Sequence, residues 1–112
     1  MKKSDPEEAL FRAALERGIA LFNQQKYVEA YEVWEERWNV EISEGVDLLQ
    51  GLLQLAVALA KLSGGNPVGC LKLLDSARQK LLPFAPEAYE LDVRALLEAI
   101  DAWRQSAESQ LS

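Results

Sequence analysis

The chain has no histidine and only one cysteine among its 112 residues. The missing histidine excludes a Ser-His-Asp or Cys-His catalytic system, a histidine proton shuttle and any zinc site that uses histidine. A single cysteine, Cys70, can form neither an internal disulfide nor a thiolate metal cage, and nothing near it in the sequence would lower its pKa. We therefore expect a small core cysteine, no metal site, no cofactor and a reducing, cytoplasmic location.

Basic residues are scarce as well. Twelve Lys and Arg stand against eighteen Asp and Glu, which gives a net charge of −6. The segment from Glu29 to Asp47 holds seven acidic residues, opposed only by Arg37. Nucleic acids and anionic membrane surfaces both require clustered positive charge on the protein. Neither is expected as a partner.

Long apolar runs are absent too. The most apolar stretch, Leu48–Ala60, contains Gln50, Gly51 and Gln54, and it is shorter than the roughly 20 apolar residues that cross a bilayer. The polar start, Met1 to Glu8, has no apolar segment typical of a secretion signal. We expect a soluble protein in which Leu48–Ala60 is the central buried helix.

Helical periodicity fills most of the chain, and capping residues mark where helices begin. Asp5 before Pro6, Asn66 before Pro67, and Asp92 are each typical of a helix N-cap, and Ser43 is a fourth candidate. Gly64-Gly65 and Pro83 are expected to end helices, with a loop from Pro83 to Leu91. The predicted helices start near residues 6, 27, 44, 67 and 93, the second of them ending near Val40 and the last near Ala107.

An internal repeat of forty residues relates the first two predicted helices to the next two. Aligning Ala30 with Cys70 places Gly18 on Ala58, Gln25 on Gly65 and Trp34 on Leu74. This rhythm of small and large residues is typical of tetratricopeptide-like helix pairs. The sequence thus predicts one all-α domain, residues 1–112, frayed at 1–4 and 108–112. We expect a compact bundle of about five helices, built from two antiparallel helical hairpins and a C-terminal helix.

The same segments resemble a known family. The motifs are Phe22-Asn23, the run from Tyr27 to Glu35, Trp38, the run from Leu49 to Leu59, and Gly65-Asn66-Pro67. In order and spacing they are similar to the bacterial and archaeal domain of unknown function 309, over about residues 14–100. The resemblance implies a small all-helical protein without an established reaction. Members of that family typically carry histidine where this chain has Tyr31, which implies that any activity depending on that histidine is lost here.

Candidate site residues come from two predicted helices. Glu32 and Glu35 lie beside the aromatic residues Tyr31 and Trp38, and Gln50 and Gln54 are the polar exceptions of the apolar helix. Glu29, Glu32 and Glu36, spaced three and four residues apart, are either a solvated helix face or a group able to approach a hard cation such as Mg²⁺ or Ca²⁺. Glu35 falls nearer the stripe of Tyr31 and Trp38 and is expected to be partly buried, with Arg37, Gln50 or Gln54 as its partner. The glutamines either hydrogen-bond within the bundle or contact a ligand.

Two functions remain open on this basis. The first is a non-enzymatic module that binds a protein or peptide, or a second copy of itself as a homodimer, through a polar-lined aromatic groove beside the helix that begins at Tyr27. Residues Tyr31, Glu32, Glu35, Trp38, Gln50 and Gln54 are its candidate contacts. The alternative is a carboxylate-based enzyme or small-ligand site centred on Glu32, Glu35 and Gln54.

Overall fold

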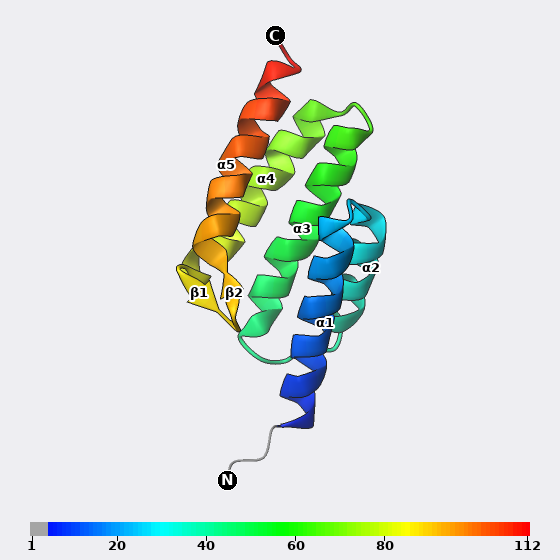
Figure 1. Cartoon of the computed structure of the whole chain (residues 1–112), viewed down its shortest axis with the longest axis vertical. Coiled ribbons are helices and arrows are strands. Elements are labelled where there is room, and N and C mark those ends of the chain that lie inside the picture. The colour runs from blue at the N-terminus through cyan, green and yellow to red at the C-terminus, as the bar shows by residue number, and fades with distance from the viewer. Residues whose placement is uncertain (1–4) are drawn as a thin grey trace.

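The computed structural model describes residues 5–112 and contains five α-helices within that range, as the capping pattern predicts (Figure 1). The expectation of fraying at residues 1–4 lies outside the described residues. A short 3₁₀ turn and a two-stranded antiparallel hairpin separate the last two helices. The elements are α1 (Pro6–Asn23), α2 (Tyr27–Trp38), α3 (Gly45–Ser63), α4 (Pro67–Leu81), η1 (Leu82–Phe84), β1 (Glu87–Ala88), β2 (Leu91–Asp92) and α5 (Val93–Ser109).

The expected capping residues begin the helices. Asp5, Asn66 and Asp92 each accept a hydrogen bond from a backbone N–H in the first turn of the helix that follows. Before α3, the Ser43 hydroxyl oxygen accepts from the N–H of Gly45 at 3.1 Å. These bonds satisfy donors that a helix N-terminus otherwise leaves unpaired. The N-termini of α1, α4 and α5 are therefore fixed by local side-chain caps, whereas α2 begins after Lys26 without one.

The forty-residue repeat is present in the backbone. Gln25 and Gly65 occupy the same place in the turns after α1 and α3, and both have left-handed backbones, with φ of 63° and 83°. The next residues, Lys26 and Asn66, donate from their N–H groups to the carbonyls of Leu21 and Lys61 at 2.9 and 2.8 Å. Two hairpins with the same turn geometry follow one another along the chain.

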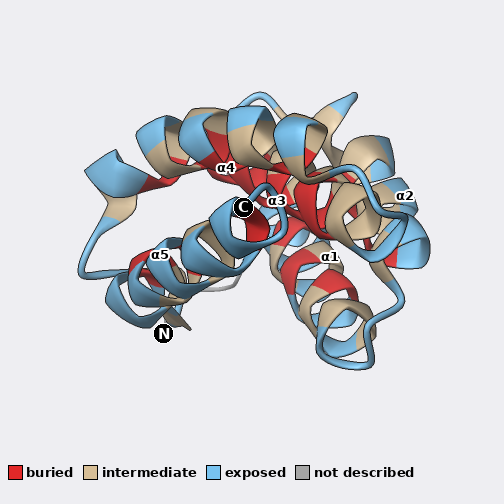
Figure 2. Cartoon of the chain, turned by 90° about the horizontal axis from the view of Figure 1, so that it is seen from above, coloured by how far each residue is buried: buried red, intermediate tan, exposed pale blue. Residues whose placement is uncertain are grey.

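Helices α2, α3 and α4 form a row, whereas α1 and α5 both lie on one side of it (Figure 2). The closest helix pairs follow the chain, α1 with α2, α2 with α3, α3 with α4 and α4 with α5. Buried residues of this row face the side on which α1 and α5 lie (Figure 2). The core contains Phe11, Leu15, Trp34, Leu48, Leu49, Leu52, Leu55, Leu59, Cys70, Leu74, Leu81, Val93, Leu97 and Ile100.

Some boundaries differ from those expected. Helix α2 ends at Trp38, two residues before Val40, and Asn39 takes its C-cap. Helix α5 runs to Ser109, past Ala107, which is completely buried and fixes the last turn against the core. The segment expected as a plain loop holds the hairpin. Its turn residues Tyr89 and Glu90 both have positive φ, 52° and 66°, the backbone that a two-residue hairpin turn requires.

Helix α3 is long and apolar enough to cross a membrane, judged by length and composition alone. Half of its most apolar window is buried inside the bundle, where it packs between α2 and α4. The core helix of a soluble protein has the same properties, so the length and composition of α3 do not indicate a membrane span.

Candidate functional site

Tyr31 and Glu35 interact directly. They lie one turn apart on α2, both are half-buried, and the Tyr31 hydroxyl donates a hydrogen bond to a carboxylate oxygen of Glu35. This hydrogen bond, together with burial and the negative charge of Glu35, raises the pKa of Tyr31 above its ordinary value of 10.0. The partner of Glu35 in the structure is thus Tyr31.

The other candidate residues lie apart from this pair. Glu32 is exposed, and Trp38 is half-buried against the core. Gln54 accepts a hydrogen bond from the Ser76 hydroxyl of α4 at 3.0 Å, and Gln50 is half-buried on the same helix as Gln54. Among residues 5–112, no group of three or more His, Cys, Asp or Glu side chains is placed to hold a metal ion.

A buried ion pair that the sequence analysis did not identify lies at the end of α2. Arg37 and Glu41 are only 10% and 5% exposed, and Nε of Arg37 lies 2.7 Å from Oε1 of Glu41. Arg37 also contacts Glu7 of α1 at 2.8 Å, and the Ser43 hydroxyl donates to Glu41 at 2.6 Å. Burial raises the pKa of Glu41, but the hydrogen bonds from Ser43 and Arg37 outweigh it, so the net pKa is lowered. This cluster ties α1, α2 and the loop before α3 together.

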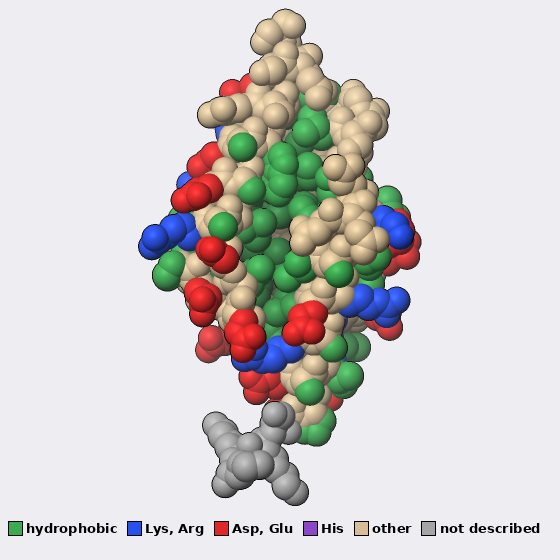
Figure 3. All heavy atoms as spheres, in the orientation of Figure 1, with side chains coloured by type: hydrophobic (Ala, Val, Ile, Leu, Met, Phe, Trp, Pro, Cys, Tyr) green, Lys and Arg blue, Asp and Glu red, His purple; other side chains and the backbone are tan. Residues whose placement is uncertain are grey.

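An apolar cavity lies over α3, between α1 and α5. Figure 3 shows a continuous strip of hydrophobic side chains there, between the two helices. The cavity encloses about 350 Å³, and most of its lining is apolar. We call it the trough. It is lined by Ile19, Phe22, Asn23, Leu52, Leu55, Leu91, Asp92, Ala95, Leu96, Ala99 and Trp103.

Aromatic contacts join α1 to the opposite side at each end of the trough. At one end the rings of Phe22 and Trp103 meet edge to face with centroids 5.7 Å apart. At the other end Phe11 meets Tyr89 of the hairpin in the same way, at 4.8 Å. Edge-to-face aromatic pairs add to the stability that buried area alone supplies. The first contact joins α1 to α5 directly, and the second joins α1 to the hairpin that precedes α5.

The trough lies elsewhere than the groove expected from the sequence, which was placed beside the helix that begins at Tyr27. It is formed by α1, α3 and α5, and none of Tyr31, Glu32, Glu35, Trp38, Gln50 or Gln54 lines it. Phe22, Leu96 and Trp103 are each half-buried and form part of the surface of the trough. Their apolar spacing marks an inward face of each helix, but it does not show that this face stays uncovered.

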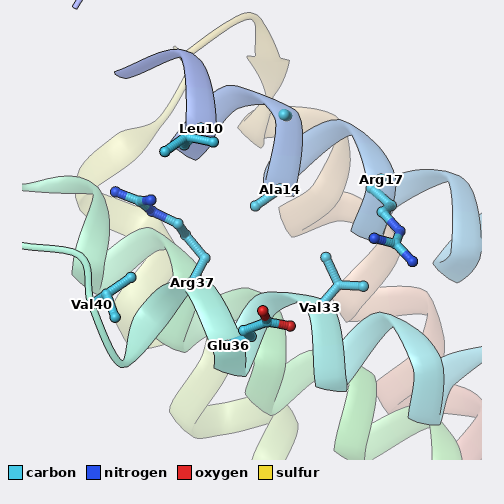
Figure 4. A pocket seen from close by; sticks show the side chains of 8 residues that line it. Leu10, Ala14, Arg17, Val33, Glu36, Arg37 and Val40 are labelled. Carbon is cyan, nitrogen blue, oxygen red and sulfur yellow. The ribbon is translucent and has the colours of Figure 1, made fainter. Parts of the chain in front are cut away.

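A second pocket lies between α1 and α2 (Figure 4). It encloses about 300 Å³ and combines apolar side chains with Arg17, Glu36 and Arg37. Its apolar lining includes Leu10 and Val40, which are 55% and 61% exposed. Ile42, two residues beyond Val40, is 97% exposed. This surface has apolar area and charges of both signs.

A protein-family model described as Domain of unknown function (DUF309) matches residues 15–73, more than half of the chain. The chain belongs to this family. The matched segment covers the second half of α1, all of α2 and α3, and about the first half of α4, so it includes the turns of both repeated hairpins. Among curated proteins, none matches the chain significantly. The family as described carries no assigned activity, so a function for its DUF309 fold must come from the geometry.

Proposed function

We propose that this DUF309 protein is a non-enzymatic, cytoplasmic binding module whose trough holds an apolar helical segment of another protein. The observation that carries the proposal is the trough itself, a cavity of about 350 Å³ with an apolar floor and apolar sides. Leu52 and Leu55 of the core form the floor, and only Asn23 and Asp92 are polar among the lining residues. Solvent-exposed apolar surface of this kind is typical of protein interaction sites.

The dimensions favour a helix as the bound segment. The α5 residues that line the trough run from Ala95 to Trp103, a length of about 12 Å in a helix, which matches roughly eight helical residues, or about two turns, of a partner. An amphipathic helix presents apolar side chains every three or four residues along one face, and such faces bind in apolar grooves. Between the Phe22–Trp103 and Phe11–Tyr89 contacts, one or two large apolar side chains would enter the cavity and supply most of the affinity.

A pair of alanine substitutions tests the proposal. Ala99 lies on α5 and lines the trough, whereas Ala20 lies exposed on α1 outside it. Ala99→Trp fills the cavity, while Ala20→Trp makes the same change in helix propensity and adds the same ring at a neutral position. Wild type and both variants are used to capture proteins from lysate of the source cells, and the captured proteins are quantified by mass spectrometry.

The expected result is a specific protein that wild type and Ala20→Trp retain equally and that Ala99→Trp loses. The same difference should be reproduced with the purified partner by calorimetry. If no protein depends on Ala99, or if both variants lose it to the same extent, the trough is not the binding surface.

Self-association through the second pocket is another candidate, supported by the exposure of Leu10, Val40 and Ile42. Arg17 of α1 and Glu36 of α2 lie on opposite sides of this pocket. In a twofold dimer, each could pair with the other in the neighbouring copy. Sedimentation of wild type and Ile42→Lys separates the cases, since a dimer through this surface should dissociate in the variant. A monomeric wild type at high concentration would exclude it.

A carboxylate-based enzyme or a small-ligand site at Glu32, Glu35 and Gln54 has less support. Glu35 is engaged by Tyr31, Gln54 by Ser76, and Glu32 faces solvent. Convergence of several carboxylates on one point is what such chemistry requires, and the contacts of these side chains favour structural roles instead.

A further inference from the structure

We infer that the helix bound in the trough carries a lysine or arginine at one end, and that this side chain lies beside Glu16 and Glu90. The inference rests on the proposed function and adds the chemistry and the direction of the bound segment. The partner is thus a basic amphipathic helix from another protein, bound in one orientation only.

A third cavity, between α1 and the β1–β2 hairpin, adjoins the trough at the end where this cation would lie. It encloses about 260 Å³ and shares Ile19 and Leu91 with the trough, so the two cavities adjoin each other. Its remaining lining residues are Arg12, Leu15, Glu16, Tyr89 and Glu90. Leu15, Ile19 and Leu91 form the apolar part of this lining, and Glu16 and Glu90 form its acidic part. A lysine or arginine has this same order of groups, an apolar stem followed by a charged head.

Carboxylates outnumber cations at this end. Arg12 is the one basic residue lining the cavity, and it is already engaged by Glu8 at 3.3 Å and Glu90 at 3.6 Å. Its guanidinium also lies 5.9 Å from the centre of the Tyr89 ring. Within residues 5–112, Glu16 has no ion-pair partner within 4 Å and is exposed, and so is Asp92 in the adjoining trough. Negative charge is therefore left over for a ligand.

The charges around Tyr89 are also mostly negative. Burial is the largest cause that raises the pKa of this phenol, and the charges of Glu44, Glu41 and Glu8 raise it further against the opposing effect of Arg12. These carboxylates lie around the cavity, in addition to Glu16 and Glu90 that line it, and negative charge attracts a cation and increases the rate at which a basic partner is encountered.

The opposite end of the trough differs. Phe22, Asn23 and Trp103 line it, and none of them is charged. A helix with its basic residue at the Glu16 end gains an attraction that the reversed helix lacks. A second copy of this chain is a poor occupant, because its net charge of −6 opposes approach to an acidic site.

The test uses displayed peptides of about 16 residues, long enough for four helical turns. Leu, Phe and Trp are allowed along one face, and Lys, Glu and Gln are allowed in equal proportion at both ends. Peptides are selected on the wild-type protein, and the best are synthesised for affinity measurement. The expected outcome is enrichment of Lys at one end only, with Glu depleted there.

Two double variants then locate the cation. Glu16→Lys with Glu90→Lys reverses charge at the cavity, and Glu29→Lys with Glu32→Lys makes an equal change in net charge on the exposed side of α2. We expect the first to weaken the selected basic peptide about tenfold or more and the second to change it less than about threefold, as for general charge effects screened by salt. Circular dichroism confirms that both variants fold.

The outcomes separate the two proposals. Selected peptides that bind in the trough without any preference for Lys, or that lose equal affinity in both double variants, overturn this inference and leave the proposed function standing. If selection recovers no peptide whose binding is lost in Ala99→Trp, both are overturned.

Discussion

Trp34 occupies the space that a side chain at residue 18 would need. A Cβ atom built on Gly18 would lie 2.0 Å from Nε1 of Trp34 and 2.2 Å from the adjacent ring carbon. The indole is 1% exposed, and its N–H has no hydrogen-bond partner among the described residues. The packing of α1 on α2 thus depends on a missing side chain, and this contact makes a first prediction possible.

Gly18→Ala should destabilise the protein by about 1–3 kcal/mol, because overpacking outweighs the gain in helix propensity of about 1 kcal/mol. Gly64→Ala is the control, since a Cβ there would meet nothing closer than 3.4 Å. Urea denaturation followed by tryptophan fluorescence measures both. Equal stability of the two variants would show that Trp34 has room to move.

The two turns of the repeat predict that substitutions at Gln25 and Gly65 change the stability of the protein in opposite directions. Gln25 has a left-handed backbone, which costs a residue other than glycine about 1 kcal/mol or more. Gln25→Gly should therefore be neutral to stabilising by about 1 kcal/mol, while Gly65→Ala should destabilise by about 1 kcal/mol. A Cβ at Gly65 would have no neighbour within 4 Å, so the loss there is purely conformational. Thermal unfolding of both variants tests this, and two changes of the same sign would contradict it.

The buried pair of Arg37 and Glu41 should contribute to stability in a way that depends on pH. The folded pKa of Glu41 is lowered from its ordinary value of 4.5. Its contribution is therefore fully present above about pH 4.5 and is lost as the pH falls through the lowered value. Urea titrations between pH 7 and pH 3 should show a smaller loss of stability for Glu41→Gln than for wild type. Parallel curves would mean that Glu41 has the same pKa in the unfolded chain.

Removing the cation tests the same pair at neutral pH. Arg37→Ala leaves Glu41 buried without its main partner and should cost about 3 kcal/mol. The control is Arg78→Ala, whose partner Asp101 is 54% exposed at 3.6 Å. That exposed pair should contribute less than about 1 kcal/mol. Similar losses in both variants would argue against burial as the cause.

The bond between Tyr31 and Glu35 predicts a shift in tyrosine ionisation. Glu35→Gln removes the charged acceptor and should lower the pKa of Tyr31 toward 10.0. Absorbance at the tyrosinate wavelength, titrated through alkaline pH, should rise earlier in this variant than in wild type. Glu32→Gln, on the exposed side of the same helix, should leave the curve unchanged. A shift of the same size in both would indicate a general charge effect.

Local signals in the sequence predicted most of the fold. Aspartate and asparagine caps located the helices, and the alignment of Ala30 with Cys70 predicted two hairpins whose turns agree hydrogen bond by hydrogen bond. The hairpin at residues 87–92 escaped prediction because Tyr89 and Glu90 occupy left-handed positions where glycine or asparagine would normally signal a turn.

The trough could not be predicted, because its two sides lie far apart in the sequence. Phe22 and Trp103 are separated by eighty-one positions, and only the path of the α2, α3 and α4 row brings them together. Periodicity shows that each residue faces inward, but it does not show whether a neighbour covers it. The Arg37–Glu41 pair did have a signal in its four-residue spacing. Its burial, however, depends on the contact with α1.

The contacts across the trough also have a mechanical consequence. Helix α1 packs mainly on α2, and α5 packs on α4, so the two sides of the trough meet chiefly through the rings of Phe22 and Trp103 and the contacts of Tyr89. Small changes in curvature of the three-helix row would therefore widen or narrow the opening while the core between neighbouring helices stays packed. The width of the trough thus depends on how the row of α2, α3 and α4 curves, in addition to the side chains that line it.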